Sequence, residues 1–101
     1  MKKIFISQPM RGKTDEEIKL ERNAVIDLAK SQFGDIEVLD TFFQDFDGRP
    51  LEFIAKSIEM LSQADVAIFA PNWEDARGCR IERQCCDEYG VPTIVLLEEL
   101  Q

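Results

Sequence analysis

A run of five consecutive apolar residues, VAIFA at positions 66–70, constrains the fold of this chain more than any other feature. The run is bounded by Asp65 and Pro71. It is far shorter than the roughly 18 residues of a membrane-spanning helix, and it is typical of a strand buried on both faces of a parallel sheet. Parallel strands need long crossover connections, which are usually helices. The chain is therefore expected to alternate strands and helices.

The rest of the sequence shows this alternation. Strands are expected over 4–6, 36–40, 66–70 and 93–97, and helices over 14–34, 50–61 and 77–89. The expected apolar stripes are Ile18, Val25, Leu28 and Ala29 on the first helix, and Leu51, Ile54, Ala55, Ile58 and Leu61 on the second. The pattern predicts an α/β, three-layer Rossmann or flavodoxin-like fold. Its four-stranded parallel sheet should have strand order 2-1-3-4 in a single domain over 1–101.

Charge and composition exclude several classes of function. The formal charge is −8, from 20 acidic and 12 basic residues, which argues against a nucleic-acid polymer or an anionic membrane as partner. The N-terminal apolar stretch is too short for a signal peptide, so a cytoplasmic protein is expected. With no histidine and only three cysteines, the chain favours neither a disulfide framework nor a zinc site nor histidine-based catalysis. No metal or other cofactor is expected.

The strand order by itself predicts where a ligand binds. In a 2-1-3-4 sheet the order reverses between the first and third strands, and ligands of such sheets bind at the carboxyl ends of the strands beside that reversal. The loops over 7–13 and 70–77 should meet there.

The first of these loops carries candidate substrate-binding residues, namely Ser7, Gln8, Pro9, Met10, Arg11 and Gly12. Gly12 would permit close backbone approach, and Arg11 and Lys13 add positive charge, so the loop could bind a phosphate at the start of the next helix. The alternative is an ordinary strand-to-helix turn. Three acidic residues at 15–17 favour this alternative, because they already complement the helix dipole.

Glu82 is the candidate catalytic residue of the second region. On the third helix its neighbours are Cys85, Cys86 and Tyr89, so its carboxylate should lie on or beside the apolar stripe, towards the end of the sheet. A carboxylate in such a cleft is a candidate nucleophile or base. The alternative is a structural ion pair with Arg11, Arg80 or Arg83.

Other residues near the strand ends have weaker claims. Trp73 could stack on a planar base, as could Phe5, Phe42, Phe43 or Phe46, although packing is the alternative for each of them. Asp75 could act as an acid or orient a sugar, as could Asp40, Asp45 and Asp47, the alternative being turn or capping chemistry. Lys56 and Ser57 could face the cleft or lie on a solvated helix face.

A family resemblance rests on the segments IFISQPMRG at 4–12, ADV at 64–66, the stretch 73–82 that ends in GCRIE, and YGVP at 89–92. Together they span nearly the whole chain and resemble a small bacterial and phage family. That family is similar, more distantly, to the nucleoside 2-deoxyribosyltransferases and the nucleoside 5′-monophosphate N-glycosidases. The resemblance implies the deoxyribosyltransferase fold and a nucleoside or nucleotide as the small-molecule partner. It also implies a homo-oligomer, whose sites are completed by a neighbouring subunit.

The resemblance also assigns roles to residues. In those enzymes a glycine, three intervening residues and a glutamate supply the nucleophile, and Gly78 and Glu82 have that spacing. The glutamate forms a covalent glycosyl-enzyme, which water or a second base resolves. In the monophosphate glycosidases an Arg-Gly pair helps to hold the phosphate, and Arg11-Gly12 matches it.

Three positions depart from the enzymes. Phe5 replaces a tyrosine whose hydroxyl contacts the glutamate, Ser57 replaces an aspartate, and Ala76 stands where the enzymes have Asp or Ser. Two hypotheses follow. One is an N-glycosidic bond hydrolase or 2-deoxyribosyltransferase in which Glu82 and Asp75 are catalytic and Trp73 and Gly78 help to bind the substrate. The other is a nucleotide-binding or sequestering module without catalysis.

Overall fold

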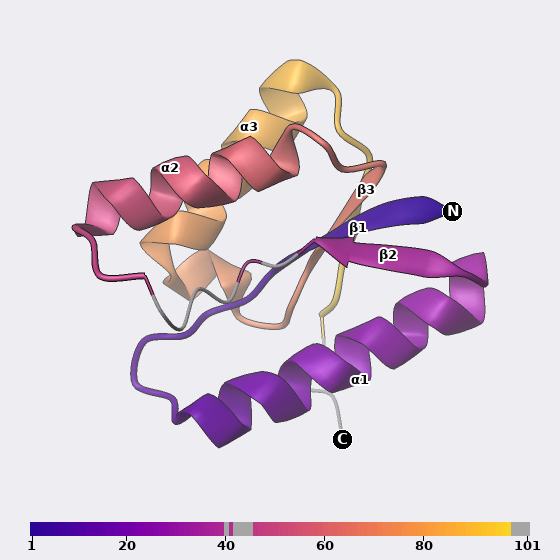
Figure 1. Cartoon of the computed structure of the whole chain (residues 1–101), viewed down its shortest axis with the longest axis horizontal. Helices are drawn as coiled ribbons and strands as arrows, with labels where there is room; N and C mark the ends of the chain where they lie inside the picture. The colour runs from indigo at the N-terminus through magenta and orange to yellow at the C-terminus, as the bar shows by residue number, and fades with distance from the viewer. Residues whose placement is uncertain (40, 42–45, 98–101) are drawn as a thin grey trace.

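The computed structural model describes residues 1–39, 41 and 46–97 of the chain. The elements are β1 Lys2–Ser7, α1 Asp15–Phe33, β2 Ile36–Leu39, α2 Pro50–Leu61, β3 Val66–Phe69, the 3₁₀ turn η1 Trp73–Asp75, α3 Arg77–Tyr89 and β4 Thr93–Val95. The four strands are parallel and lie in the order β2-β1-β3-β4. The helix α1 covers one face of the sheet, and α2 and α3 cover the other (Figure 1). The predicted α/β architecture and strand order are therefore confirmed.

Strand pairing moves several of the predicted strand ends, two of them by two residues. β1 begins earlier than expected, because Lys2 and Lys3 pair with the start of β2 although their side chains are not apolar. β4 ends at Val95, because its neighbour β3 ends at Phe69, the residue that pairs with Val95. Leu97, expected to be the last strand residue, is 87% exposed.

The core consists of two clusters, one on each face of the sheet. Ile4 and Ile6 of β1 belong to the cluster packed against α1, whereas Phe5 belongs to the cluster on the opposite face. Successive side chains of a strand point to opposite faces. Ser7 therefore lies on the same face as Phe5, which is the face covered by α2 and α3.

The apolar stripes of α1 and α2 differ from those predicted. Arg22 is buried on α1 together with Ile18, Val25 and Ala29, whereas Leu28 is 45% exposed. The Arg22 guanidinium is satisfied inside, since it donates to the Leu39 carbonyl at 3.0 Å and to Thr41 Oγ1 at 3.1 Å.

On α2 the correction concerns two predicted stripe residues, Leu51 and Ala55, which are both exposed. Leu51 is 79% exposed, because Pro50, Phe53, Ile54 and Ser57 form the helix face that turns inward at this end.

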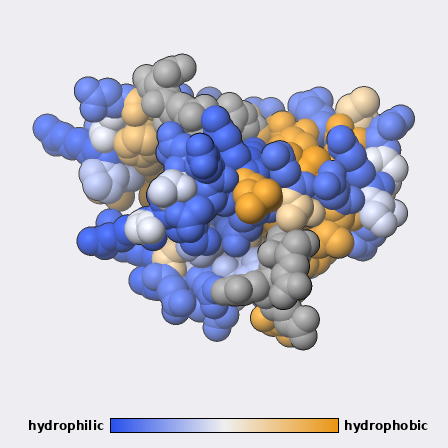
Figure 2. Space-filling model, turned by 90° about the horizontal axis from the view of Figure 1, so that it is seen from below, coloured by the Kyte–Doolittle hydropathy of each residue, from blue (hydrophilic) through white to orange (hydrophobic). Residues whose placement is uncertain are grey.

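Seen from the α1 side, the surface is mostly hydrophilic, with apolar residues between the charged ones (Figure 2). Among the described elements α1 alone covers this face of the sheet, and Ile94 and Leu96 on the β4 side are half-buried. None of the helices in the described part of the chain combines the length and the apolar character needed to cross a bilayer.

Candidate functional site

A cavity of about 730 Å³ opens at the carboxyl ends of β1 and β3, where the strand order predicts a ligand site. The loop after β1, one face of α2 and the start of α3 form its walls. The two loops are joined where the Ala70 N–H donates to the Ser7 carbonyl at 2.9 Å. Small-molecule sites have volumes of roughly 300–1,000 Å³, so this cavity has the size of a ligand site.

Glu82 is buried at one wall of this cavity, on the second turn of α3. Only 7% of its surface is exposed, and its Oε1 accepts a hydrogen bond from Ser7 Oγ at 2.6 Å. Ser57 of α2 lines the same cavity, and its hydroxyl lowers the pKa of Glu82. Burial raises the pKa of Glu82 from 4.5 to about 7, and the two serine hydroxyls act in the opposite direction.

The ion-pair alternative for Glu82 is wrong for all three arginines considered, since none of the ion pairs among the described residues includes Glu82. Arg80 Nη1 donates to the Glu74 carbonyl at 2.7 Å, and Arg83 Nε pairs with Asp87 at 3.3 Å. Glu82 forms no ion pair with any residue that the structure describes. Its carboxylate is therefore held by neutral hydroxyl groups and faces the cavity that Arg11 also lines.

Two serine hydroxyls lie where two of the three departures would leave Glu82 without a polar neighbour. Phe5 is fully buried in the apolar cluster, but Ser7 lies two residues further along the same strand face and supplies a hydroxyl to Glu82. Ser57, which the resemblance aligns with an aspartate of the enzymes, lines the same cavity and lowers the pKa of Glu82. Ser7, which was predicted to bind substrate, lines the cavity and donates its hydroxyl hydrogen to Glu82.

The start of α3 forms another part of the wall. Ala76 is the N-cap residue and has no side chain that could cap the helix, and the first turn contains no acidic residue. The N–H groups of residues 77–79 precede the first intrahelical bond, which Arg80 donates to Ala76. A helix end with free N–H groups and a positive dipole is suited to bind an anion.

Gly78 allows this helix end to approach α2. A Cβ atom at position 78 would lie 3.0 Å from Ile54 Cδ1, closer than most such contacts. The close approach brings Ser57 of α2 and Glu82 of α3 to the same cavity.

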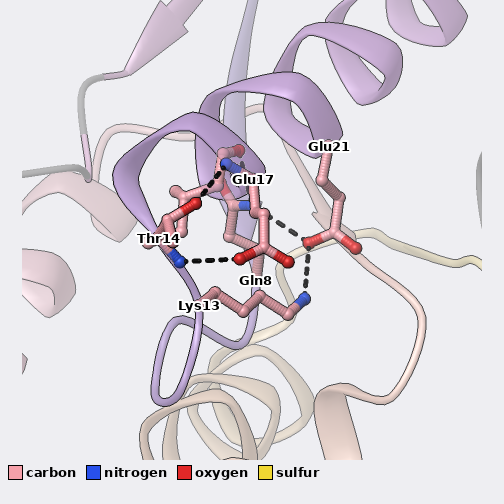
Figure 3. A network of polar contacts seen from close by, with 6 residues as sticks. Gln8, Lys13, Thr14, Glu17 and Glu21 are labelled. Atoms are coloured by element: carbon pink, nitrogen blue, oxygen red, sulfur yellow. Dashed lines mark hydrogen bonds and ion pairs between the residues drawn. The ribbon is translucent and has the colours of Figure 1, made fainter.

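The start of α1, in contrast, is satisfied by its own chain. Thr14 and Glu17 form a capping box, and Lys13 pairs with Glu21 at 3.4 Å (Figure 3). Gly12 does not line the cavity, and nothing lies within 4 Å of where its Cβ would be. Its φ of +81° favours a glycine, so the conformation of the turn by itself accounts for this residue.

The predicted loop residues divide between the cavity and the support behind it. Pro9, Met10 and Arg11 line the cavity. Gln8 also lines it but is 5% exposed, and its Nε2 donates to the Ile18 carbonyl at 3.2 Å and to Glu21 Oε1 at 3.0 Å (Figure 3). These bonds attach the loop to α1.

The two candidates of the second loop have different positions. Asp75 lies at the exposed rim of the cavity. Trp73 is not part of the wall, since its ring packs edge-on against Phe69 with centroids 5.6 Å apart and lies under the Arg83 guanidinium. The prediction of a stacking wall at Trp73 does not fit this arrangement. Among the described residues, Phe53 of α2 is the aromatic side chain that lines the cavity.

Several lining residues were missed by sequence reasoning, namely Pro50, Phe53, Ile54, Arg77 and Arg80. The signal that could have found the α2 face is Ser57, a polar residue at i+3 from Ile54 and i+4 from Phe53. On α3, Tyr89 is 85% exposed, so the inward stripe consists of Cys79, Glu82 and Cys86. The candidates Asp40, Phe42, Phe43 and Asp45 lie outside the described residues.

Comparisons of the chain with protein-family models, with curated proteins and with solved structures found no match. Among the residues that the structure describes, no group of three or more His, Cys, Asp or Glu side chains could hold a metal ion.

Proposed function

We propose that this protein cleaves the N-glycosidic bond of a nucleotide, on a deoxyribosyltransferase-like fold, with Glu82 as the nucleophile. The observation that carries the proposal is the Glu82 carboxylate. It is buried, oriented by Ser7 and Ser57, and lies in the same cavity as the open N-terminus of α3. The spacing from Gly78 to Glu82 also matches that of the enzymes named above.

In the first step, the free carboxylate oxygen of Glu82 attacks C1′ of the sugar while the C1′–N bond breaks. The electron pair of that bond leaves with the base, which takes up a proton from solvent or from Asp75 at the rim. The step requires Glu82 to be ionised. Its pKa of about 7 still leaves a substantial fraction of the carboxyl group ionised at neutral pH.

In the second step, water attacks C1′ and the bond to Glu82 breaks, which returns the electron pair to the carboxylate. The water gives up one proton, which balances the proton taken up by the base. The products are the free base and the sugar phosphate, with retention at C1′. Ser7 and Ser57 orient the carboxylate in both steps, and Phe53 provides an apolar wall for the base.

The test is release of free base from nucleosides and 5′-monophosphates of the common bases, measured by chromatography. We expect Glu82→Gln to lower the rate by about a thousandfold or more, because amide nitrogen and oxygen cannot replace the nucleophile. Glu88→Gln, an exposed glutamate on the same helix, is the matched control and should retain activity. Mass spectrometry after an acid quench should locate the sugar adduct on Glu82. Equal base release by wild type and Glu82→Gln would refute the proposal.

The second candidate is a nucleotide-binding module without turnover. The position of Asp75 favours this candidate. Among the described residues of the cavity wall, Asp75 is the one acidic residue besides Glu82, and it is exposed at the rim. Glu82 therefore has no buried acidic partner in this part of the chain that could serve as the acid. Ligand-induced stabilisation without any base release would support it.

The resemblance also predicts a homo-oligomer. Size-exclusion chromatography with light scattering would measure its mass, and a monomer at all concentrations would contradict that part of the proposal.

A further inference from the structure

The charge around the cavity is opposite to that of the whole chain. The chain carries 20 acidic and 12 basic residues, yet among the described residues of the cavity wall three are arginines and two are acidic. The arginines are Arg11, Arg77 and Arg80, half of the six in the sequence. One of the two acidic residues is Glu82, which is partly neutral because its pKa is raised to about 7. Positive charge is therefore concentrated where a ligand enters.

The arginines are available to a ligand. Neither Arg11 nor Arg77 forms an ion pair with a residue in the described part of the chain, and both are exposed. Arg80 uses Nη1 to bind the Glu74 carbonyl, which holds its side chain, and its other donors have no hydrogen-bond partner among the described residues. Arg83, on the same helix, is not in the wall and pairs with Asp87.

One phosphate group does not use all of these donors. The open N–H groups at residues 77–79 and one bidentate guanidinium already supply enough donors to bind a single phosphate. Arg77 and Arg80 are neighbours at i and i+3 on α3, with Cβ atoms about 5–6 Å apart, while Arg11 comes from the loop after β1. Three guanidinium groups that come from two different elements can bind more than one phosphate.

We infer that the cavity takes a nucleotide with two or more phosphates, and that Arg77 and Arg80 bind the phosphates beyond the first. This inference rests on the proposed function and specifies its substrate class. The base and sugar lie towards Glu82 and Phe53, one phosphate lies at the N-terminus of α3, and the rest of the chain of phosphates extends to the arginines at the mouth.

The experiment compares ligands that differ only in phosphate number. Dissociation constants are measured by calorimetry for orthophosphate, pyrophosphate and tripolyphosphate, and for the mono-, di- and triphosphates of the common nucleosides. Glu82→Gln protein is used in parallel, so that turnover does not distort binding. We expect diphosphates to bind about a hundredfold more tightly than monophosphates, because Arg77 and Arg80 each add a charge-assisted contact that contributes about tenfold.

Variants of the arginines identify the source of this preference. Arg77→Ala and Arg80→Ala should each lower the ratio of diphosphate to monophosphate affinity by about tenfold. Lys19→Ala, which removes a positive charge from the exposed surface of α1 outside the cavity wall, should keep the ratio. Equal affinity for mono- and diphosphates, or a ratio unchanged in both arginine variants, would overturn the inference.

The two proposals fail in different ways. Base release from monophosphates with no preference for diphosphates would refute this inference and leave the N-glycosidase proposal standing. An arginine-dependent preference for diphosphates, without base release from any nucleotide, would refute the enzyme and support polyphosphate binding by the cavity.

Discussion

The N-termini of α1 and α3 both follow a strand that ends at the same edge of the sheet, yet they are built in opposite ways. α1 is capped by Thr14, and its first turn contains Asp15, Glu16 and Glu17. α3 has Ala76 at its N-cap position, which provides no capping side chain, and its first turn contains no acidic residue. Where side chains of the same chain accept hydrogen bonds from the first backbone N–H groups of a helix, fewer donors remain for a ligand. An uncapped helix N-terminus beside a cavity keeps these N–H groups available.

A glutamate near each of these ends shows the same contrast. The pKa of Glu17 is lowered, chiefly because its carboxylate accepts a hydrogen bond from the Thr14 backbone. The pKa of Glu82 is raised to about 7, because burial disfavours its charged form. The same residue type thus serves as a cap on one helix and as a candidate nucleophile on the other, and burial decides which.

The largest expected effect concerns the stability cost of Glu82. Its pKa in the folded state lies above the unfolded value of 4.5, so the folded protein binds the extra proton between about pH 4.5 and pH 7. Stability should therefore fall as the pH rises through this window and stay level above it. Glu82→Gln should remove the loss, which is of the order of 3 kcal/mol at pH 8 and absent at pH 4.

Urea unfolding of wild type and Glu82→Gln across this pH range measures the effect. Glu88→Gln is the control for removing an exposed charge from the same helix. Parallel stability curves for wild type and Glu82→Gln would show that Glu82 is not buried as the structure has it.

The next effect comes from giving α3 the kind of cap that α1 has. Ala76→Asp places an acceptor at a residue whose φ of −107° and ψ of 124° suit an N-cap. The variant should gain about 1 kcal/mol of stability and bind pyrophosphate at least about tenfold more weakly, because the carboxylate repels the anion.

Ala76→Asn is the matched control for that variant, since it caps the helix without a charge. It should stabilise the protein similarly and weaken pyrophosphate binding less. Unchanged pyrophosphate binding by Ala76→Asp would place the anion elsewhere in the cavity.

Opening the cap of α1 should have a purely structural effect. Thr14→Ala removes the side-chain oxygen that accepts from the Glu17 N–H at 3.1 Å, which should cost about 1 kcal/mol and lower Tm by about 4–8 °C. Thr14→Ser keeps the oxygen and should restore the stability. Calorimetry should find pyrophosphate affinity unchanged, and a clear loss would mean that α1 also takes part in binding.

The smallest effect is expected at Lys13. Its ion pair with Glu21 joins side chains that are 30% and 19% exposed, so Lys13→Ala should change stability by no more than about 1 kcal/mol. Pyrophosphate affinity should change by less than about twofold, because Lys13 is not in the cavity wall. A tenfold loss of affinity would contradict the contrast between the two helix ends.

Periodicity was sufficient for most of the fold, because each strand and helix has its own local signal. The run at 66–70 is the buried strand β3, and Thr14 and Gly90 flank the helices that they were predicted to start and end. The stripe of α1 was less accessible to prediction. Arg22 displaces Leu28 from the inside because the end of β2 offers it the Leu39 carbonyl and Thr41.

The candidate site was predictable to a lesser degree. The position of Glu82 on an inward helix stripe and the location of the cleft followed from spacing and strand order. The packing of Trp73 against Phe69 did not follow from the sequence, because the sequence does not distinguish an aromatic ring that lines a cavity from one that packs in the core. The α2 face with Phe53 depended on how closely α2 and α3 approach at Gly78.

The amino-acid sequence alone determined the alternation of strands and helices, the strand order and the helix that carries Glu82, because these depend on neighbours in the chain and on connection rules. Tertiary structure decided what surrounds that carboxylate. Ser7 and Glu82 are 75 positions apart and meet only because α3 packs on the face of the sheet to which the Ser7 side chain points. Burial, and with it the raised pKa, is a property of that packing and has no local pattern from which it could be predicted.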